Sequence, residues 1–378
     1  MAEHFHHQSP FLPAQGPDLS ERPTEPLAPS GSSQRTWPAV LTLVFLAPVV
    51  GEMLSGSTPP LRFLDPVSLL GLLGLYGGGA LVIRELVRRK GLDWRSLLLF
   101  ALAYGVVEEG LVVMSWFNPG WPDLGQLAYY GRLFETSWIW AVQLTIYHAV
   151  VSIIPPIVLV EILFPRIAAR SWLTPRGLKI AAVIFGCVCL LEFPGFWLIA
   201  NMQSGYAHPP LMYAGALLLV IGLVWWGIKL RPERLPVDPR PVPHLWWLRL
   251  AGFGGIFLVF LVAWVIAGLK PHPLLPVAVM VAVFVLGYWL VSRWHRRASW
   301  SSRHKLALVS GILSFFILLT PFAEFSQGTG NKDTRGMTVV GIIFLLGLIA
   351  LAWRERRRAR LLSPLTKPGE RSTITASY

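Results

Sequence analysis

Ten long apolar stretches, separated by short polar loops, limit what this chain can fold into. The 378 residues are 54% hydrophobic and 14% charged, which is too apolar for a soluble protein of this length. A helix needs about 20 apolar residues to cross a bilayer. Stretches near that length cover residues 38–55, 66–87, 96–117, 138–163, 178–200, 209–230, 248–269, 273–293, 305–325 and 336–353. The sequence therefore predicts an all-α, polytopic transmembrane helical bundle of about ten spans.

Positive charge alternates from one loop to the next. Of the 33 Lys and Arg residues, 28 fall in the two tails or around the loops after the second, fourth, sixth and eighth predicted spans. Because cytoplasmic loops are rich in Lys and Arg, we expect both termini in the cytoplasm. This pattern predicts a multi-pass protein of the cell (cytoplasmic) membrane, with the lipid bilayer as its partner. The formal net charge of +13 does not indicate nucleic-acid binding, because the charges are confined to these loops.

The pattern of polar residues divides the chain into four parts. Residues 1–36 are polar and Pro-rich, which predicts a disordered cytoplasmic N-terminal tail. Residues 37–200 hold spans one to five and carry the intramembrane polar residues. Residues 201–360 hold spans six to ten, which contain few ionisable groups and are expected to serve as scaffold. Residues 361–378 are expected to form a second disordered cytoplasmic tail.

Glu108 and Glu109 are adjacent in the third predicted span, between two apolar runs. A charged side chain at the centre of a bilayer costs at least about 2.5–3.5 kcal/mol, so such residues usually have a functional or pairing role. His148, in the fourth predicted span, is expected at similar depth and is the best partner candidate. Because neighbouring helical residues diverge by about 100°, only one of the two glutamates is expected to point directly at a given partner. Buried structural carboxyl groups and a hydrogen-bonded core histidine are the alternative interpretation.

Four other residues are candidate accessories to this cluster. Tyr104 precedes Glu108 by one helical turn and can donate a hydrogen bond to it, and Ser152 follows His148 by one turn. Glu52 lies near the outer end of the first span, where it can reach a cavity or be solvated. Glu192 stands before Pro194, and a helix break beside a carboxylate is typical of transporters.

Charged residues near the expected cytoplasmic ends of the spans have a structural interpretation. Glu85 shares a helical stripe with Gly71, Gly74 and Gly78, and such a small-residue face packs closely on another helix. We expect neighbouring arginines, among them Arg84, to neutralise Glu85. An interfacial salt bridge is expected between Glu161 and Arg166.

The Glu108–Glu109 pair, followed by an intramembrane His148 with a small residue four positions later (Ser152), resembles the CAAX-protease and bacteriocin-processing family. The resemblance implies an intramembrane hydrolytic site lined by paired glutamates and histidines, with a glutamate activating water and a metal involved. The family pattern has an arginine four residues after the second glutamate, where this chain has Val113. It also has a second intramembrane histidine, which is not found here. A divergent or inactive relative is therefore an open alternative.

Three functions remain open on the sequence. The first is an intramembrane metal-dependent hydrolase in which Glu108, Glu109 and His148 are catalytic residues and hold one divalent metal such as Zn. The second is a proton-coupled transporter or carrier that uses the same carboxylates. The third is a non-catalytic membrane scaffold. Two carboxylates and one imidazole supply three protein ligands, the number found in open catalytic zinc sites. The sequence specifies neither the substrate nor the oligomeric state.

Overall fold

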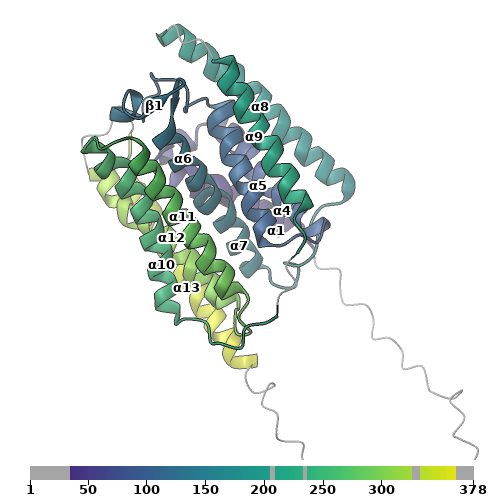
Figure 1. The fold of residues 1–378 in the computed structure, drawn as a ribbon. Helices are drawn as coiled ribbons and strands as arrows, with labels where there is room; N and C mark the ends of the chain where they lie inside the picture. The colour runs from purple at the N-terminus through teal and green to yellow at the C-terminus, as the bar shows by residue number, and fades with distance from the viewer. Residues whose placement is uncertain (1–34, 205–208, 233–235, 326–332, 363–378) are drawn as a thin grey trace, which may run out of the picture. The chain divides into compact units, whose positions relative to one another are not determined.

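The computed structural model describes residues 35–204, 209–232, 236–325 and 333–362 (Figure 1). It divides the chain into two units, Met1–Arg35 and Thr36–Tyr378, and the second unit holds all the elements below. The predictions of disorder for residues 1–36 and 361–378 fall almost wholly outside the described residues.

The first part of the described chain consists of helical segments joined end to end. Several pairs form one continuous helix whose winding changes from α to π partway along. The elements are α1 (Trp37–Pro48), η2 (Val49–Met53), α2 (Pro60–Phe63), α3 (Pro66–Leu72), η3 (Leu73–Gly77), α4 (Gly78–Arg89), α5 (Trp94–Val106), η4 (Val107–Val112), η5 (Gly125–Ala128), α6 (Trp138–Tyr147), η6 (His148–Ile153) and α7 (Ile154–Leu163). A two-residue antiparallel pair, β1 (Arg132–Leu133) and β2 (Thr136–Ser137), precedes α6.

The second part is made of long helices. They are α8 (Pro175–Ser204), α9 (Pro210–Lys229), α10 (Leu245–Phe260) continued by η7 (Leu261–Ile266), α11 (Leu274–His295), α12 (Ser302–Phe325) and α13 (Met337–Leu362). Large apolar side chains are exposed along α8, α9, α11 and α13, for example Leu190 (73%) and Leu218 (68%). Such faces suit a hydrocarbon surrounding better than water.

Eight helices of the described chain are long and apolar enough to cross a membrane. They coincide with eight of the ten predicted spans. The first predicted span corresponds to the shorter apolar helix Trp37–Met53. The third corresponds to the continuous helix formed by α5 and η4, which ends at Val112, five residues before its expected end. The polytopic helical bundle is thus confirmed, whereas the count of ten and the sides of the termini stay predictions.

Local sequence explains where several helices begin. Proline occupies the first turn of α1, α3 and α9, where its missing N–H removes no intrahelical hydrogen bond. The carboxylate of Asp65 caps α3 by accepting from the backbone N–H of Ser68 (3.0 Å), and Asp93 caps α5 through Arg95 (3.0 Å). The Pro155–Pro156 pair opens α7, directly after the π-helical segment η6.

Close helix packing builds the bundle around α5, α7 and α12. Helix α5 packs on α9, α12 lies between α10 and α13, and α7 contacts both α1 and α12 (Figure 1). The predicted small-residue stripe is confirmed, because Val188 lies directly over Gly74 and Phe185 over Gly78. Between α10 and α12 the backbones themselves meet, since Gly311 faces the carbonyl oxygen of Arg249.

Candidate functional site

Glu108, Glu109 and His148 form one buried cluster. Nε2 of His148 lies 2.9 Å from Oε1 of Glu109, and Nδ1 lies 3.0 Å from Oε2 of Glu108. The exposed fractions of Glu108, Glu109 and His148 are 3%, 9% and 1%. One ligand atom from each residue can be chosen so that all three lie within 4.8 Å of one another. The predicted convergence of these three side chains is therefore what the structure shows.

Both glutamates reach the histidine, which corrects the expectation that only one would. The imidazole ring offers a nitrogen on each of two edges, and each nitrogen meets a different carboxylate. The backbone that carries the pair is π-helical, and the N–H of Val113 bonds to the carbonyl of Glu108 five residues earlier (2.8 Å). A π-turn holds more residues than an α-turn, so neighbouring side chains diverge less.

Four π-helical segments come together around this cluster. They carry Glu52 (η2), Tyr76 (η3), the glutamate pair (η4) and His148 with Ser152 (η6). Segments η2 and η6 pack on each other, and η4 contacts α8, α9 and α6. π-Helical turns are rare and occur frequently at functional sites. Their convergence therefore indicates a functional site here, independently of the charged residues.

The turn after η4 positions the Glu109 carboxylate. Met114 has a left-handed backbone (φ 60°), uncommon for a residue with a side chain, and this reverses the chain after the helix. The reversal brings the hydroxyl of Ser115 back to donate to Oε2 of Glu109. Ser115 in turn accepts from the indole N–H of Trp140 (2.9 Å). Glu109 is thus oriented by a hydrogen-bonded chain that is entirely buried.

His148 is enclosed by aromatic rings. The ring centroids of Tyr147, Tyr76 and Tyr104 lie 5.1, 6.0 and 6.1 Å from that of the imidazole. Oγ of Ser152, the predicted neighbour, lies 3.2 Å from Nδ1. Nδ1 therefore faces both a hydroxyl and a carboxylate, and Nε2 faces Glu109 alone. The ring is fixed in position by contacts on every edge.

Two buried oxygens at the cluster lack a hydrogen-bond partner among the described residues. They are Oε2 of Glu108 and the hydroxyl of Tyr104. The Glu108 oxygen is close to Nδ1 of His148, but the contact lacks hydrogen-bond alignment. The predicted contact between Tyr104 and Glu108 is present, because the two side chains interact electrostatically, although its geometry does not meet the criteria for a hydrogen bond. Unsatisfied buried oxygens are costly, so this side of the cluster has capacity for a further ligand.

Glu52 joins the edge of the cluster through tyrosine contacts. Its carboxylate accepts from the hydroxyl of Tyr76 and from that of Thr58 (2.6 Å). The neighbouring Gly51 carbonyl accepts from the hydroxyl of Tyr147. Glu52 is half-buried and its carboxylate is satisfied, so of its two predicted surroundings the structure favours the protein interior.

Glu192 lies apart from the three residues of the cluster. Its carboxylate packs against Gly71 on α3, and it is half-buried. The expected helix break beside it is wrong, because α8 continues through Pro194. Proline is tolerated inside membrane helices, and Pro194 lies on an exposed part of α8.

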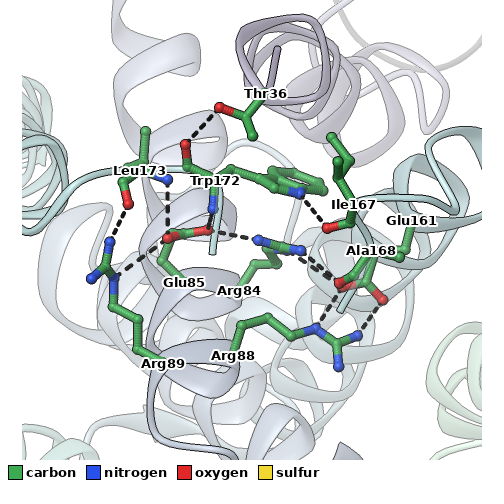
Figure 2. Close-up of polar contacts among 10 residues, drawn as sticks. All are labelled: Thr36, Arg84, Glu85, Arg88, Arg89, Glu161, Ile167, Ala168, Trp172 and Leu173. Atoms are coloured by element: carbon green, nitrogen blue, oxygen red, sulfur yellow. Dashed lines mark hydrogen bonds and ion pairs between the residues drawn. The ribbon is translucent and has the colours of Figure 1, made fainter. Parts of the chain in front are cut away.

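A second buried polar network lies at the end of α4 (Figure 2). Glu85 is fully buried and pairs with Arg84 (2.6 Å) and Arg89 (3.5 Å), which confirms the expected neutralisation by neighbouring arginines. Glu85 also accepts from the backbone N–H groups of Trp172 (2.8 Å) and Leu173 (3.2 Å). The guanidinium of Arg84 lies 3.5 Å from the centre of the Trp172 ring. These contacts fix the loop between α7 and α8 to α4.

Glu161 takes different partners from the one expected. It pairs with Arg88 (2.5 Å) and Arg84 (3.3 Å) of α4, as Figure 2 shows, and not with Arg166. The reason is that α7 packs on α4, so a residue near the end of α7 meets the arginines of that helix before those of the following loop. This network joins α4 to α7 and to the loop before α8.

The sequence did not identify Tyr76, Tyr147, Ser115 or Trp140 as parts of the site. Aromatic and hydroxyl side chains are ordinary in membrane helices, so they carry no signal without the fold. The one available signal was the spacing of Ser115 from Glu109, directly after the apolar run in which the helix ends. The four residues become visible only through contacts between separate helices.

Comparison with known proteins identifies a family and one relative. A protein of Archaeoglobus fulgidus, described as "Uncharacterized protein", is 31% identical over 126 residues, which span 33% of this chain and 38% of that protein. No solved structure matches the chain. A family model described as "Uncharacterized membrane protein family" matches residues 41–364, which include the whole cluster and nearly all the helices. The chain therefore belongs to this membrane protein family.

Proposed function

We propose that the protein is an intramembrane hydrolase that holds one divalent metal ion, such as Zn²⁺, at Glu108, Glu109 and His148. The observation that supports this most strongly is the buried set of two carboxylates and one imidazole with ligand atoms within 4.8 Å. The resemblance of the same three residues to the CAAX-protease and bacteriocin-processing family supports it further.

The donor set fits a metal by its chemistry and size. Zinc bonds to nitrogen and oxygen at about 2.0–2.2 Å in a tetrahedral site, so two ligands of one ion lie about 3.4 Å apart. The ligand atoms lie within 4.8 Å of one another, so metal binding requires the widest pair to close by up to about 1.4 Å. The unpartnered Oε2 of Glu108 would be satisfied in this way. When bound, such an ion lowers the pKa of a water ligand to about 7 and polarises a carbonyl oxygen.

The surrounding residues would orient the ligands and exclude bulk water. Ser115 and Trp140 fix the Glu109 carboxylate, and partners of this kind commonly change metal affinity 10–100-fold. Ser152 and the three tyrosine rings hold the imidazole. The hydroxyl of Tyr104 is unpartnered and near enough to Glu108 to interact electrostatically, so it can donate to a bound substrate. The Glu108 carboxylate can accept a proton from water.

Metal stoichiometry of the full-length protein tests this proposal. His4, His6 and His7 are first replaced by alanine in every sample, because that tract can bind metal on its own. We expect about one equivalent in this background and almost none after Glu108→Gln/Glu109→Gln/His148→Ala. Glu192→Gln is the matched control, since it makes the same chemical change outside the cluster and should keep the metal. Absence of metal from the background protein, with several divalent ions offered, would refute the proposal.

One observation favours proton-coupled transport as a second candidate. Both nitrogens of His148 already face carboxylates, so the charge of a protonated imidazole would be compensated on both sides without any metal. In that case the metal-free protein should show a carboxyl infrared band that titrates with external pH and disappears in Glu109→Gln. A metal-binding protein should lose this titration when the ion is added.

The membrane orientation belongs to the same proposal. We place the protein in the cytoplasmic membrane with both termini in the cytoplasm, because 28 of the 33 basic residues follow that alternation. Cysteine labelling of the loop that holds Lys270, compared with the loop that holds Arg296, tests it. Labelling of only the Lys270 loop by an impermeant reagent on intact cells is the expected result.

A further inference from the structure

Four arginines and one histidine line a cavity at the opposite end of α10 from η7. The cavity has a volume of about 280 Å³, and its lining residues are His244, Leu245, Arg249, Arg303, Arg356 and Arg360. They come from the beginnings of α10 and α12 and from the end of α13. No carboxylate is among the lining residues. The space is enough for a phosphate group with several water molecules, since a water molecule occupies about 30 Å³.

The positive charges in this cavity are close enough to act on one another. The guanidinium of Arg249 on α10 experiences the like charge of Arg356 on α13. An anion placed between them would replace a repulsion by two attractions. Arginine is also the side chain best suited to phosphate, because its planar guanidinium donates two parallel hydrogen bonds. The first turns of α10 and α12 add the positive ends of two helix dipoles, which the negative end of α13 offsets in part.

The fold brings these charges together through an unusually close helix contact. Gly252 faces the carbonyl of Leu308, and Gly311 faces the carbonyl of Arg249, so the backbones of α10 and α12 touch. Arg249 and Arg303 are thereby held near each other. The packing of α10 on α12 therefore keeps the arginines of the cavity close together, and an anionic ligand would offset the repulsion between them.

The surrounding side chains indicate a membrane interface. Trp246 and Trp247, which follow the first residue of α10, are each 61% exposed, and Trp353 on α13 is 59% exposed. Exposed tryptophans gather at the level of lipid headgroups. Leu250, next to Arg249, is 46% exposed and begins the apolar surface of α10. An anion in the cavity would therefore be at headgroup level, with apolar helix surface beside it.

We propose that this cavity is a binding site for the phosphate headgroup of an anionic membrane lipid. Basic pockets between membrane helices are known to take such headgroups. The proposal is independent of the function of the Glu108 cluster, because the two sites share no residue.

Lipid binding to the full-length protein tests the proposal. The protein is purified in neutral detergent, and its binding of dioleoyl phosphatidic acid, dioleoyl phosphatidylcholine and inorganic phosphate is followed by native mass spectrometry. The variant Arg249→Gln/Arg356→Gln removes two charges from the cavity. Arg357→Gln/Arg358→Gln is the matched control, because it removes two charges from the same end of α13 without touching the lining.

We expect phosphatidic acid to bind the cavity variant about 25-fold more weakly, since each of the two basic groups contributes a factor of about five near an anionic lipid. The control should stay within about threefold of the wild type, and phosphatidylcholine should bind all three proteins weakly. Equal loss in both variants, or no loss in either, would overturn the proposal. Inorganic phosphate that binds as tightly as phosphatidic acid would overturn the assignment to a lipid.

The folding of the cavity variant is checked by its thermal midpoint without lipid. We expect no decrease, because the substitution removes a repulsion. If this variant nevertheless fails to fold, Arg303→Gln on α12 replaces it, with an expected fivefold loss in the same assay. Unchanged binding by Arg303→Gln would then contradict the proposal.

Discussion

Replacement of Glu85 by alanine removes the centre of the buried network at the end of α4. The carboxylate is fully buried, and its partner Arg84 is 1% exposed. Loss of one member of a buried ion pair costs about 3–5 kcal/mol, because the other charge stays buried without compensation. The backbone N–H groups of Trp172 and Leu173 also lose their acceptor. We therefore expect the free energy of unfolding to fall by an amount near the upper end of that range.

Glu161→Ala serves as the comparison, because it removes the other carboxylate of the same network at a more exposed position. Glu161 is 13% exposed at its side chain, its partner Arg88 is 32% exposed, and Arg84 would keep Glu85. Because Arg88 can be rehydrated, we expect a cost of about 1–2 kcal/mol. Denaturant unfolding of the purified protein in detergent, followed by circular dichroism, measures both variants. Glu85→Gln keeps an acceptor oxygen and should fall between them. A Glu85→Ala cost no larger than that of Glu161→Ala would refute the reasoning.

Three further predictions concern single contacts. Ser115→Ala should weaken divalent-metal binding about 10–100-fold in a metal titration, because Glu109 loses its orienting donor, whereas Ser310→Ala should have no effect. Gly311→Leu should destabilise the protein in thermal unfolding by at least about 1–3 kcal/mol, because no side chain fits against the facing carbonyl; Gly347→Leu, which meets open space, should not. Tyr147→Phe should cost about 0.5–1.5 kcal/mol in the same assay, because the Gly51 carbonyl loses the Tyr147 hydroxyl but keeps the hydroxyl of Ser55 (3.0 Å) as a donor.

The fold could be predicted where one free-energy contribution, the cost of unpaired backbone groups in lipid, dominates. Apolar stretches of membrane length must become helices, because lipid offers no partner for the backbone, and eight of them do. The end of the third helix was missed by five residues because the reversal at Met114 depends on a left-handed backbone that no apolar pattern encodes. The π-helical segments could not be predicted either. One extra residue in a helical turn changes the spacing of apolar residues no more than ordinary sequence irregularity does.

The cluster itself could be predicted because ionisable side chains in a membrane-spanning segment carry a large free-energy cost. The apolar runs around them make three ionisable residues conspicuous in the sequence: Glu108, Glu109 and His148. Because an unpaired ionisable group in hydrocarbon is unfavourable, we expected these side chains to contact one another. Ser115 and Trp140 carry no comparable free-energy cost in a membrane helix, so their sequence positions do not indicate a partner. Their link to Glu109 is made only by the turn after η4, which places Ser115, and by α6, which places Trp140. The partner of Glu161 was mistaken for the same reason, because helix packing rather than distance along the chain decides it.

The four π-helical segments suggest how such a site can be acquired. A single residue inserted into an established α-helix can be absorbed as one wide turn, and the helix on either side then keeps its apolar faces toward the same neighbours. Glu52, Tyr76, Glu109 and His148 all lie in turns of this kind. A helical bundle could therefore gain these four positions through single-codon insertions and lose them through single-codon deletions, with the rest of its packing left in place.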